Sequence, residues 1–84
     1  MEMEVRHLPF AKSFDLESQR WCVVGKDMHG ADFGIGVARK LESAVERLRE
    51  WVEEVLAQEG RAWEDLPQGK GAGDAISFVG KQRQ

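Results

Sequence analysis

Cysteine is nearly absent from this 84-residue chain, in which Cys22 stands alone. A single cysteine cannot form an internal disulfide, and such chains are typical of a reducing compartment. No apolar run approaches the roughly 20 residues that cross a bilayer, and the acidic, alternating residues 1–4 lack the pattern of a signal peptide. We therefore expect a cytoplasmic protein with no membrane partner.

Basic residues are outnumbered, because 12 Lys and Arg stand against 15 Asp and Glu and give a net charge of −3. Nucleic-acid-binding domains usually carry a basic stripe. Here the cations alternate with glutamates and are in local excess only at Arg39, Lys40, Lys81 and Arg83. Binding of DNA or RNA is therefore not expected. The length predicts one domain over residues 1–80, followed by a short polar tail at 81–84.

Alternation of apolar and charged residues predicts a first strand at residues 1–6. Pro9 has no backbone N–H, so this strand is expected to end, bulge or lie at a sheet edge there, before a further strand segment at 10–14. The polar run at 15–19 predicts a hairpin loop. Four consecutive apolar residues then predict a central strand that is covered on both faces, Trp21-Cys22-Val23-Val24.

Large apolar residues alternate with glycines in the next predicted strand, Phe33-Gly34-Ile35-Gly36-Val37. The three large residues are expected to share one face and the two glycines the other. Two glycines on one face indicate a bulge or the close approach of another segment, which we interpret as a partner. The candidate partner-binding residues of this strand are Phe33, Gly34, Ile35 and Gly36.

An amphipathic helix from about Lys40 to Gln58 is the strongest pattern in the sequence. Its apolar residues recur at spacings of three and four, and glutamates and arginines occupy the opposite face. Gly60 is a stop signal, whereas no Ser, Thr, Asp or Asn precedes Leu41 as a cap. A further helical turn is expected at 63–67, and a last strand at 75–79 with Ile76 and Phe78 facing inward.

Trp63 lies in the polar stretch after this helix and is the fifth candidate partner-binding residue, because tryptophan is enriched at interfaces. The alternative is that its ring caps the end of the core. The element order is strand, strand, strand, helix, strand. This order predicts an α+β fold, with a three- to four-stranded, mostly antiparallel sheet and one long amphipathic helix on one face.

No set of residues predicts catalysis, so we expect neither an enzyme nor a bound cofactor. No closed metal site is predicted by the spacing of Asp27, His29 and Asp32. Cys22 is expected to be an inert core thiol, and His7 a surface or interface residue. The glycine-rich loop Gly69–Gly73 follows a predicted helix and precedes a strand, the reverse of a phosphate-binding loop, so we interpret it as a connector.

The helical segment resembles the helix of HicB-type antitoxin domains over Lys40-Leu41-Glu42-Ser43-Ala44-Val45-Glu46-Arg47-Leu48-Arg49-Glu50-Trp51. Asp15 followed by Trp21-Cys22-Val23-Val24 is similar to the first hairpin of that family. Residues 30–36 fall where its glycine-bearing turn and third strand lie. The resemblance covers about residues 5–60. It implies a partly RNase H-like domain that pairs with itself and masks a small RNase toxin.

Residues 61–84 do not resemble the C-terminal ribbon-helix-helix or helix-turn-helix segment to which the family assigns operator binding, so DNA binding does not carry over. The leading hypothesis is a HicB-like regulatory module that occludes a protein partner. A second is a phage- or host-encoded inhibitor of a nucleic-acid-binding machine, with the helix's acidic face mimicking phosphates. A third is a small ligand-binding domain that uses the loop Gly69–Gly73.

Overall fold

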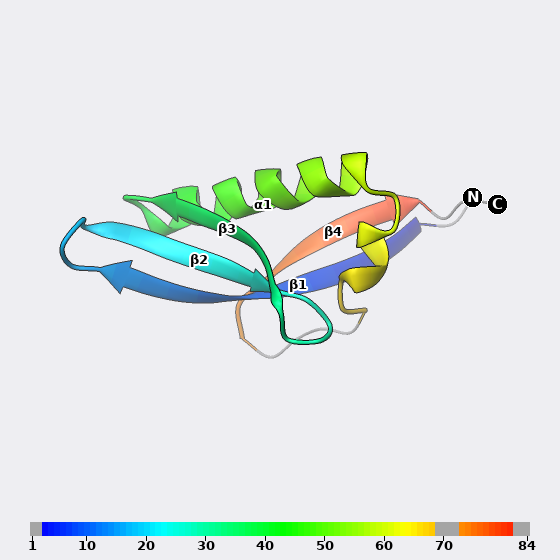
Figure 1. The fold of residues 1–84 in the computed structure, drawn as a ribbon, viewed down its shortest axis with the longest axis horizontal. Coiled ribbons are helices and arrows are strands. Elements are labelled where there is room, and N and C mark those ends of the chain that lie inside the picture. Colours follow the sequence, from blue (N-terminus) through cyan, green and yellow to red (C-terminus); the bar gives the residue numbers. More distant parts are fainter. Residues whose placement is uncertain (1–2, 69–72, 82–84) are drawn as a thin grey trace.

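A computed structural model describes residues 3–68 and 73–81 of the chain (Figure 1). Its elements are β1 (Met3–Asp15), β2 (Arg20–Lys26), β3 (Asp32–Ala38), α1 (Leu41–Gln58), the short 3-10 helix η1 (Ala62–Asp65) and β4 (Ala75–Lys81). The strands form one antiparallel sheet in the order β3-β2-β1-β4. The predicted α+β fold and its element order are therefore confirmed.

The first two predicted strand segments form one strand, β1, which continues through Pro9. Residues Met3 to Pro9 pair with β4, and residues Phe10 to Asp15 pair with β2 on the other side. Backbone donors alternate between the two edges of a strand. The N–H of His7 points away from β4, to the carbonyl of Pro67, and that of Phe10 points to Asp74. Pro9 has the same orientation as His7, so the N–H that proline lacks would point away from β4. On that side of β1, pairing with β2 begins only at Phe10, and no ladder hydrogen bond is lost.

Helix α1 packs on the glycine side of β3. A Cβ built on Gly36 would lie 2.7 Å from the backbone N of Leu48 and closer still to the carbonyl of Ala44. A Cβ on Gly34 would lie 2.8 Å from side-chain atoms of Leu48 and Trp51. Gly36 therefore lets the helix backbone rest on the strand, and Gly34 leaves room for side chains of the helix.

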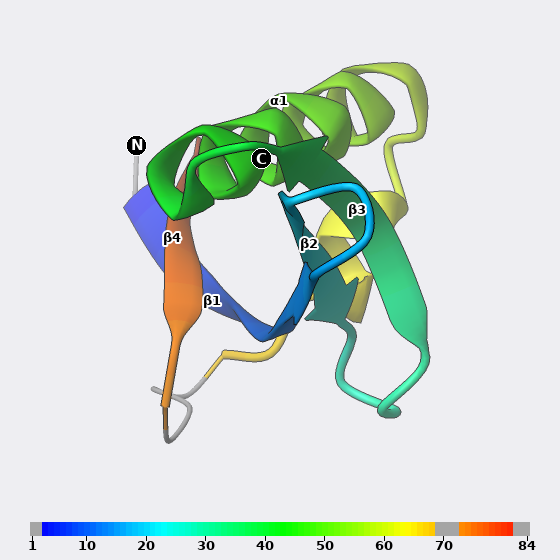
Figure 2. The ribbon, with the colours of Figure 1, turned by 90° about the vertical axis from the view of Figure 1, so that its left-hand side faces the viewer.

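The core lies between α1 and the sheet, and its largest fully buried side chains are Leu8, Val23, Leu48, Val52 and Leu66. Ile76 and Phe78 of β4 are also buried, which confirms their predicted inward orientation. Viewed along the long axis, the sheet curves and α1 lies across the opening between β3 and β4 (Figure 2). Among the described residues, no helix is long and apolar enough to cross a membrane.

The prediction that β2 is covered on both faces is wrong. Val23 is fully buried, but its neighbours Cys22 and Val24 are only partly buried. They face away from α1, and no described helix lies on that side of the sheet (Figure 1). With one long helix available, only one face of the sheet can be covered.

Candidate protein-binding site

The uncovered face of the sheet carries a strip of apolar side chains near its β3 edge. We call this set, Cys22, Val24, Ile35 and Val37, the outer strip. Val24 pairs in register with Ile35, and Cys22 with Val37. Residues directly opposite in antiparallel strands place their side chains side by side on one face. The four side chains therefore form a continuous surface across β2 and β3.

The outer strip remains accessible in the folded chain. The exposed fractions are 48% for Ile35 and 38% for Val37, although both are large aliphatic residues in a strand. On the β1 side the strip adjoins Ala11, which pairs in register with Val24. Single exposed apolar residues are common on protein surfaces, but contiguous ones mark interaction sites. The outer strip is therefore the principal candidate site on this molecule.

A second apolar patch lies on the same face at the other end of the sheet, where Val5 of β1 pairs with Val79 of β4. Their exposed fractions are 46% and 59%. Next to them His7 and Ser77 are joined by a hydrogen bond between Nδ1 and Oγ, at 2.9 Å. This exposed polar pair interrupts the apolar surface, so the second patch is smaller and separate.

The structure divides the predicted partner-binding residues of β3 between the two faces of the sheet. Ile35 belongs to the outer strip and is available to a partner. Gly34 and Gly36 lie beneath α1. The segment that approaches these glycines is therefore the chain's own helix and not a partner, because the contact is made within the fold.

Phe33 leaves the face of Ile35 and Val37 because β3 contains an irregularity there. Val24 pairs with Ile35, but Lys26 pairs with Asp32, so Phe33 and Gly34 together oppose Gly25. Gly34 has a φ of +94°, as is common in a bulge. The ring of Phe33 packs edge-on against Trp51 of α1, with centroids 6.1 Å apart. Phe33 is thus part of the packing between β3 and the helix.

Trp63 is held inside the fold at the end of the core. Its ring lies over the backbone of Gly80, where an added Cβ would approach within 2.9 Å, and 5.3 Å from the guanidinium carbon of Arg6. Its indole N–H donates to the Glu4 carboxylate at 2.9 Å. The side chain is only partly exposed. The capping alternative therefore describes Trp63 better than a role at an interface.

Arg6 joins η1 to β1 by donating to the carbonyls of Trp63 and Leu66, at 3.0 and 3.3 Å, and to the Glu4 carboxylate at 3.3 Å. Its Nε has no partner among the described residues. The hydrogen bond from Trp63, with further help from Arg6, holds the pKa of Glu4 below its ordinary value. This network is partly buried at one end of the sheet and supports the fold.

The remaining polar candidates are engaged in local structure. The Asp27 carboxylate accepts the backbone N–H groups of His29 and Ala31, at 2.8 and 2.9 Å, which shapes the loop after β2. Asp32 forms an ion pair with Lys26. In the part of the chain that is described, no group of three or more potential metal ligands comes together. Most of the loop Gly69–Gly73 lies outside the described residues.

Cys22 and Val24 were not expected at the surface from the sequence, which predicted that both faces of their strand are covered. The sequence did contain a signal for their exposure, because one long helix can cover only one face of a sheet, and alternate residues of β2 must then face outward.

A scan against protein-family models found no match, and searches among curated proteins and solved structures found none either. The case for a function therefore rests on the geometry of the outer strip.

Proposed function

We propose that this protein is a small protein-binding module that places the outer strip against a partner protein and occludes the surface it covers. The observation that carries this proposal is the row of paired apolar side chains across β2 and β3, which are exposed or partly exposed on a face that no described helix covers. Burying apolar surface is the main driving force of protein association. Mutual burial would stabilise a complex without any chemical step.

The finer form of the proposal is a HicB-like antitoxin that masks a small RNase toxin, and its support is the resemblance over residues 5–60.

The acidic face of α1 is a weaker candidate for binding a partner than the outer strip. Its exposed glutamates are interrupted by Arg47 and Arg49, and Arg49 forms an ion pair with Glu46 at 3.8 Å. A surface of mixed sign is a poor mimic of a regular phosphate array.

The test uses Ile35→Asp, which places a charge in the middle of the outer strip. Leu16→Asp is the matched control, because Leu16 is 82% exposed in the β1–β2 loop and receives the same chemical change. Tagged native protein and both variants are expressed in the source cells. In each of them a photo-crosslinking residue replaces Val37, and the partner chain that becomes crosslinked is identified by mass spectrometry.

One specific partner is expected to be crosslinked by the native chain and by Leu16→Asp, and its recovery is expected to fall about tenfold or more with Ile35→Asp, because a buried unpaired charge costs well over 1 kcal/mol. Equal recovery with both variants, or no specific partner with any of them, contradicts the proposal. If a specific partner is recovered, its co-expression with this chain shows whether the partner is an RNase and whether this chain inhibits it.

A further inference from the structure

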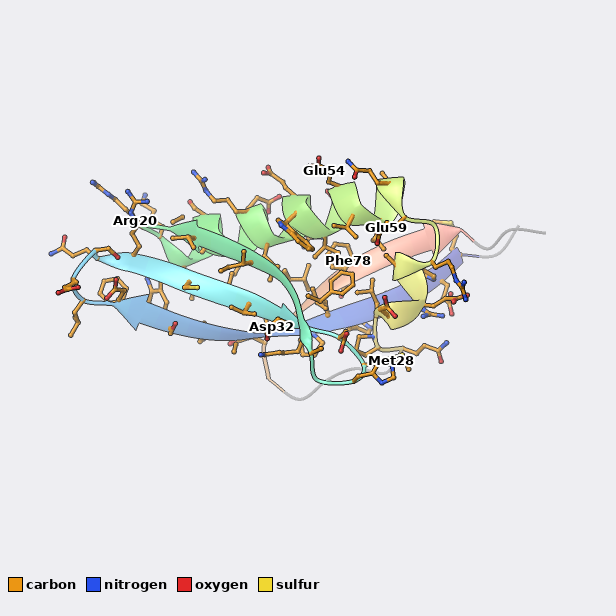
Figure 3. All side chains as sticks on the ribbon, viewed as in Figure 1. Arg20, Met28, Asp32, Glu54, Glu59 and Phe78 are labelled. Carbon is orange, nitrogen blue, oxygen red and sulfur yellow. The ribbon has the colours of Figure 1, made fainter. Side chains whose placement is uncertain are left out.

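Four cations from three elements of the chain, β2, the β3–α1 connection and α1, meet at the end of the outer strip. Arg20 begins β2, Arg39 and Lys40 join β3 to α1, and Arg47 lies in the second turn of the helix. Together with Ser43, Val37 and Ala38 they line one open groove. Figure 3 places Arg20 at this end of the molecule, beside other nitrogen-bearing side chains. We call this feature the basic groove.

The basic groove continues the outer strip. Trp21 pairs with Ala38 and Cys22 with Val37, and the next residues along the chain are Arg20, the first residue of β2, and Arg39, which follows β3. Because side chains alternate between the faces of a strand, Arg20 lies on the same face as Cys22, and Arg39 lines the groove together with Arg20 and Val37. A partner that covers the outer strip and extends past Val37 therefore meets these two guanidinium groups.

The cations of the basic groove are not neutralised by the ion pairs of the described residues, which are Glu4–Arg6, Lys12–Asp74, Lys26–Asp32 and Glu46–Arg49. Asp15 is the register partner of Arg20. Its carboxylate accepts instead from the Ser18 hydroxyl at 2.8 Å and from the N–H of Glu17.

The start of α1 adds to this positive potential, since its cap residue Lys40 makes no side-chain cap hydrogen bond and the first N–H groups of a helix carry partial positive charge. The whole chain has a net charge of −3. Taking away the four positive charges of the groove leaves −7 for the other residues, so the basic groove is a local exception on an acidic molecule.

We infer that the basic groove binds carboxylates of an acidic segment in the partner protein, next to the apolar residues that cover the outer strip. This inference rests on the proposed function for its apolar half and extends it to the chemistry of the partner. Arginine and a helix N-terminus both suit carboxylate oxygens. Complementary charge beside an apolar contact sets the orientation of a complex and speeds its formation.

A nucleic acid fits this surface less well, although phosphates also bind arginine. A polyanion longer than the groove would run onto the acidic remainder of the molecule, where it is repelled. The outer strip beside the groove consists of aliphatic side chains and a cysteine, so it offers no aromatic ring on which bases could stack. A short acidic and apolar peptide segment satisfies both halves of the surface.

Fluorescence anisotropy with defined probes tests this inference. The main probe is a labelled peptide of three valines followed by four glutamates. A second peptide replaces the valines by serines, a third replaces the glutamates by lysines, and a thymidine heptanucleotide represents nucleic acid. The protein variants are Arg39→Glu and Arg47→Glu. Arg61→Glu is the matched control. Arg61 is exposed before η1, away from the groove, and its substitution changes the net charge by the same amount as the groove variants do.

The valine–glutamate peptide is expected to bind the native protein and Arg61→Glu equally. Its affinity is expected to fall about fivefold or more in each groove variant, and on raising the salt from about 50 to about 500 mM. Equal affinity of groove variants and control, preference for the lysine peptide, or tighter binding of the oligonucleotide overturns the inference. Circular dichroism of each variant verifies that it is folded.

The serine–glutamate peptide separates the two proposals. Groove-dependent binding of this peptide, with no effect of Ile35→Asp on either acidic peptide, keeps the carboxylate site and removes the outer strip from it. Loss of binding with Ile35→Asp but not with the groove variants has the opposite meaning. It supports the proposed apolar interface and overturns the assignment of the basic groove.

Discussion

At the scale of single residues, the atoms that pack on a position decide whether that position requires glycine. Gly36 faces backbone atoms of α1, which cannot move aside as a flexible side chain could. Gly60, after the same helix, has no atom within 4 Å of an added Cβ. The two positions have the same residue type and opposite tolerance, and this contrast makes the packing of α1 on β3 measurable.

Gly36→Ala is expected to lower the free energy of unfolding by about 3 kcal/mol or more, near the upper end of overpacking effects, because the helix must shift as a unit. Gly60→Ala is the control, and it is expected to be neutral or to stabilise by up to about 1 kcal/mol through the unfolded chain. Urea denaturation measures both values. Equal effects of the two substitutions would mean that α1 does not rest on β3 as described.

The carboxylate of Glu4 reports on the packing of Trp63. Replacing Trp63 by Phe removes the indole N–H that donates to Glu4, so the pKa of Glu4 is expected to rise toward its ordinary value. Because the folded-state pKa is lowered, the native interaction stabilises the protein above the ordinary pKa and is lost as the pH falls through the folded value. NMR titration of the carboxyl carbon measures the shift. Trp51→Phe should leave it unchanged.

At the scale of elements, the β1–β2 hairpin turns without glycine. Gln19 takes a φ of +56° at the end of the loop, a conformation that costs an L-residue roughly 1–2 kcal/mol. The absence of glycine in residues 15–19 did not prevent a turn there. Asp15 supports the turn by accepting hydrogen bonds from Glu17 and Ser18.

Gln19→Gly is expected to stabilise the protein by about 0.5 kcal/mol, because relief of the positive φ exceeds the entropy that glycine adds to the unfolded chain. Leu16→Gly in the same loop, where φ is not positive, is expected to destabilise it slightly. Thermal denaturation of the two variants gives the comparison. A destabilised Gln19→Gly protein would argue against the described turn.

At the scale of the whole molecule, the sheet has one face that stabilises the fold and one that does not. Val23 and Val24 are neighbours in β2, but Val23 is fully buried beneath the helix and Val24 belongs to the outer strip. The outer strip lies on the face that α1 leaves open, and the basic groove adjoins it where β2, β3 and the start of α1 meet. Substitutions there are therefore expected to change the proposed binding at little cost to folding.

Val23→Ala is expected to cost about 2 kcal/mol or more of stability, since it removes buried methyl groups from the core. Ile35→Asp is expected to change stability by less than about 1 kcal/mol, because Ile35 is half exposed. Chemical denaturation under identical conditions measures both. A large loss with Ile35→Asp would mean that the outer strip is packed within the fold and is not a free surface.

Periodicity along the sequence was sufficient for the elements and for the inward faces of β4 and α1, because local alternation records which side of an element is apolar. The helix predicted over 40–58 begins at Leu41 and ends at Gln58. Of the candidate site, Ile35 was identified from the sequence. Gly34 and Gly36 were recognised as a close-approach surface, but the approaching segment was not identified.

The sequence by itself therefore determined the α+β fold, the amphipathic helix and the existence of an apolar row on β3. Only the tertiary structure decided that α1 takes the glycine side, that Trp63 caps the core, and that Arg20 and Arg47 join Arg39 and Lys40 in one groove. The reason is physical: periodicity is a property of neighbours in the chain, whereas burial and charge clustering depend on strand order and register between residues that are far apart in it.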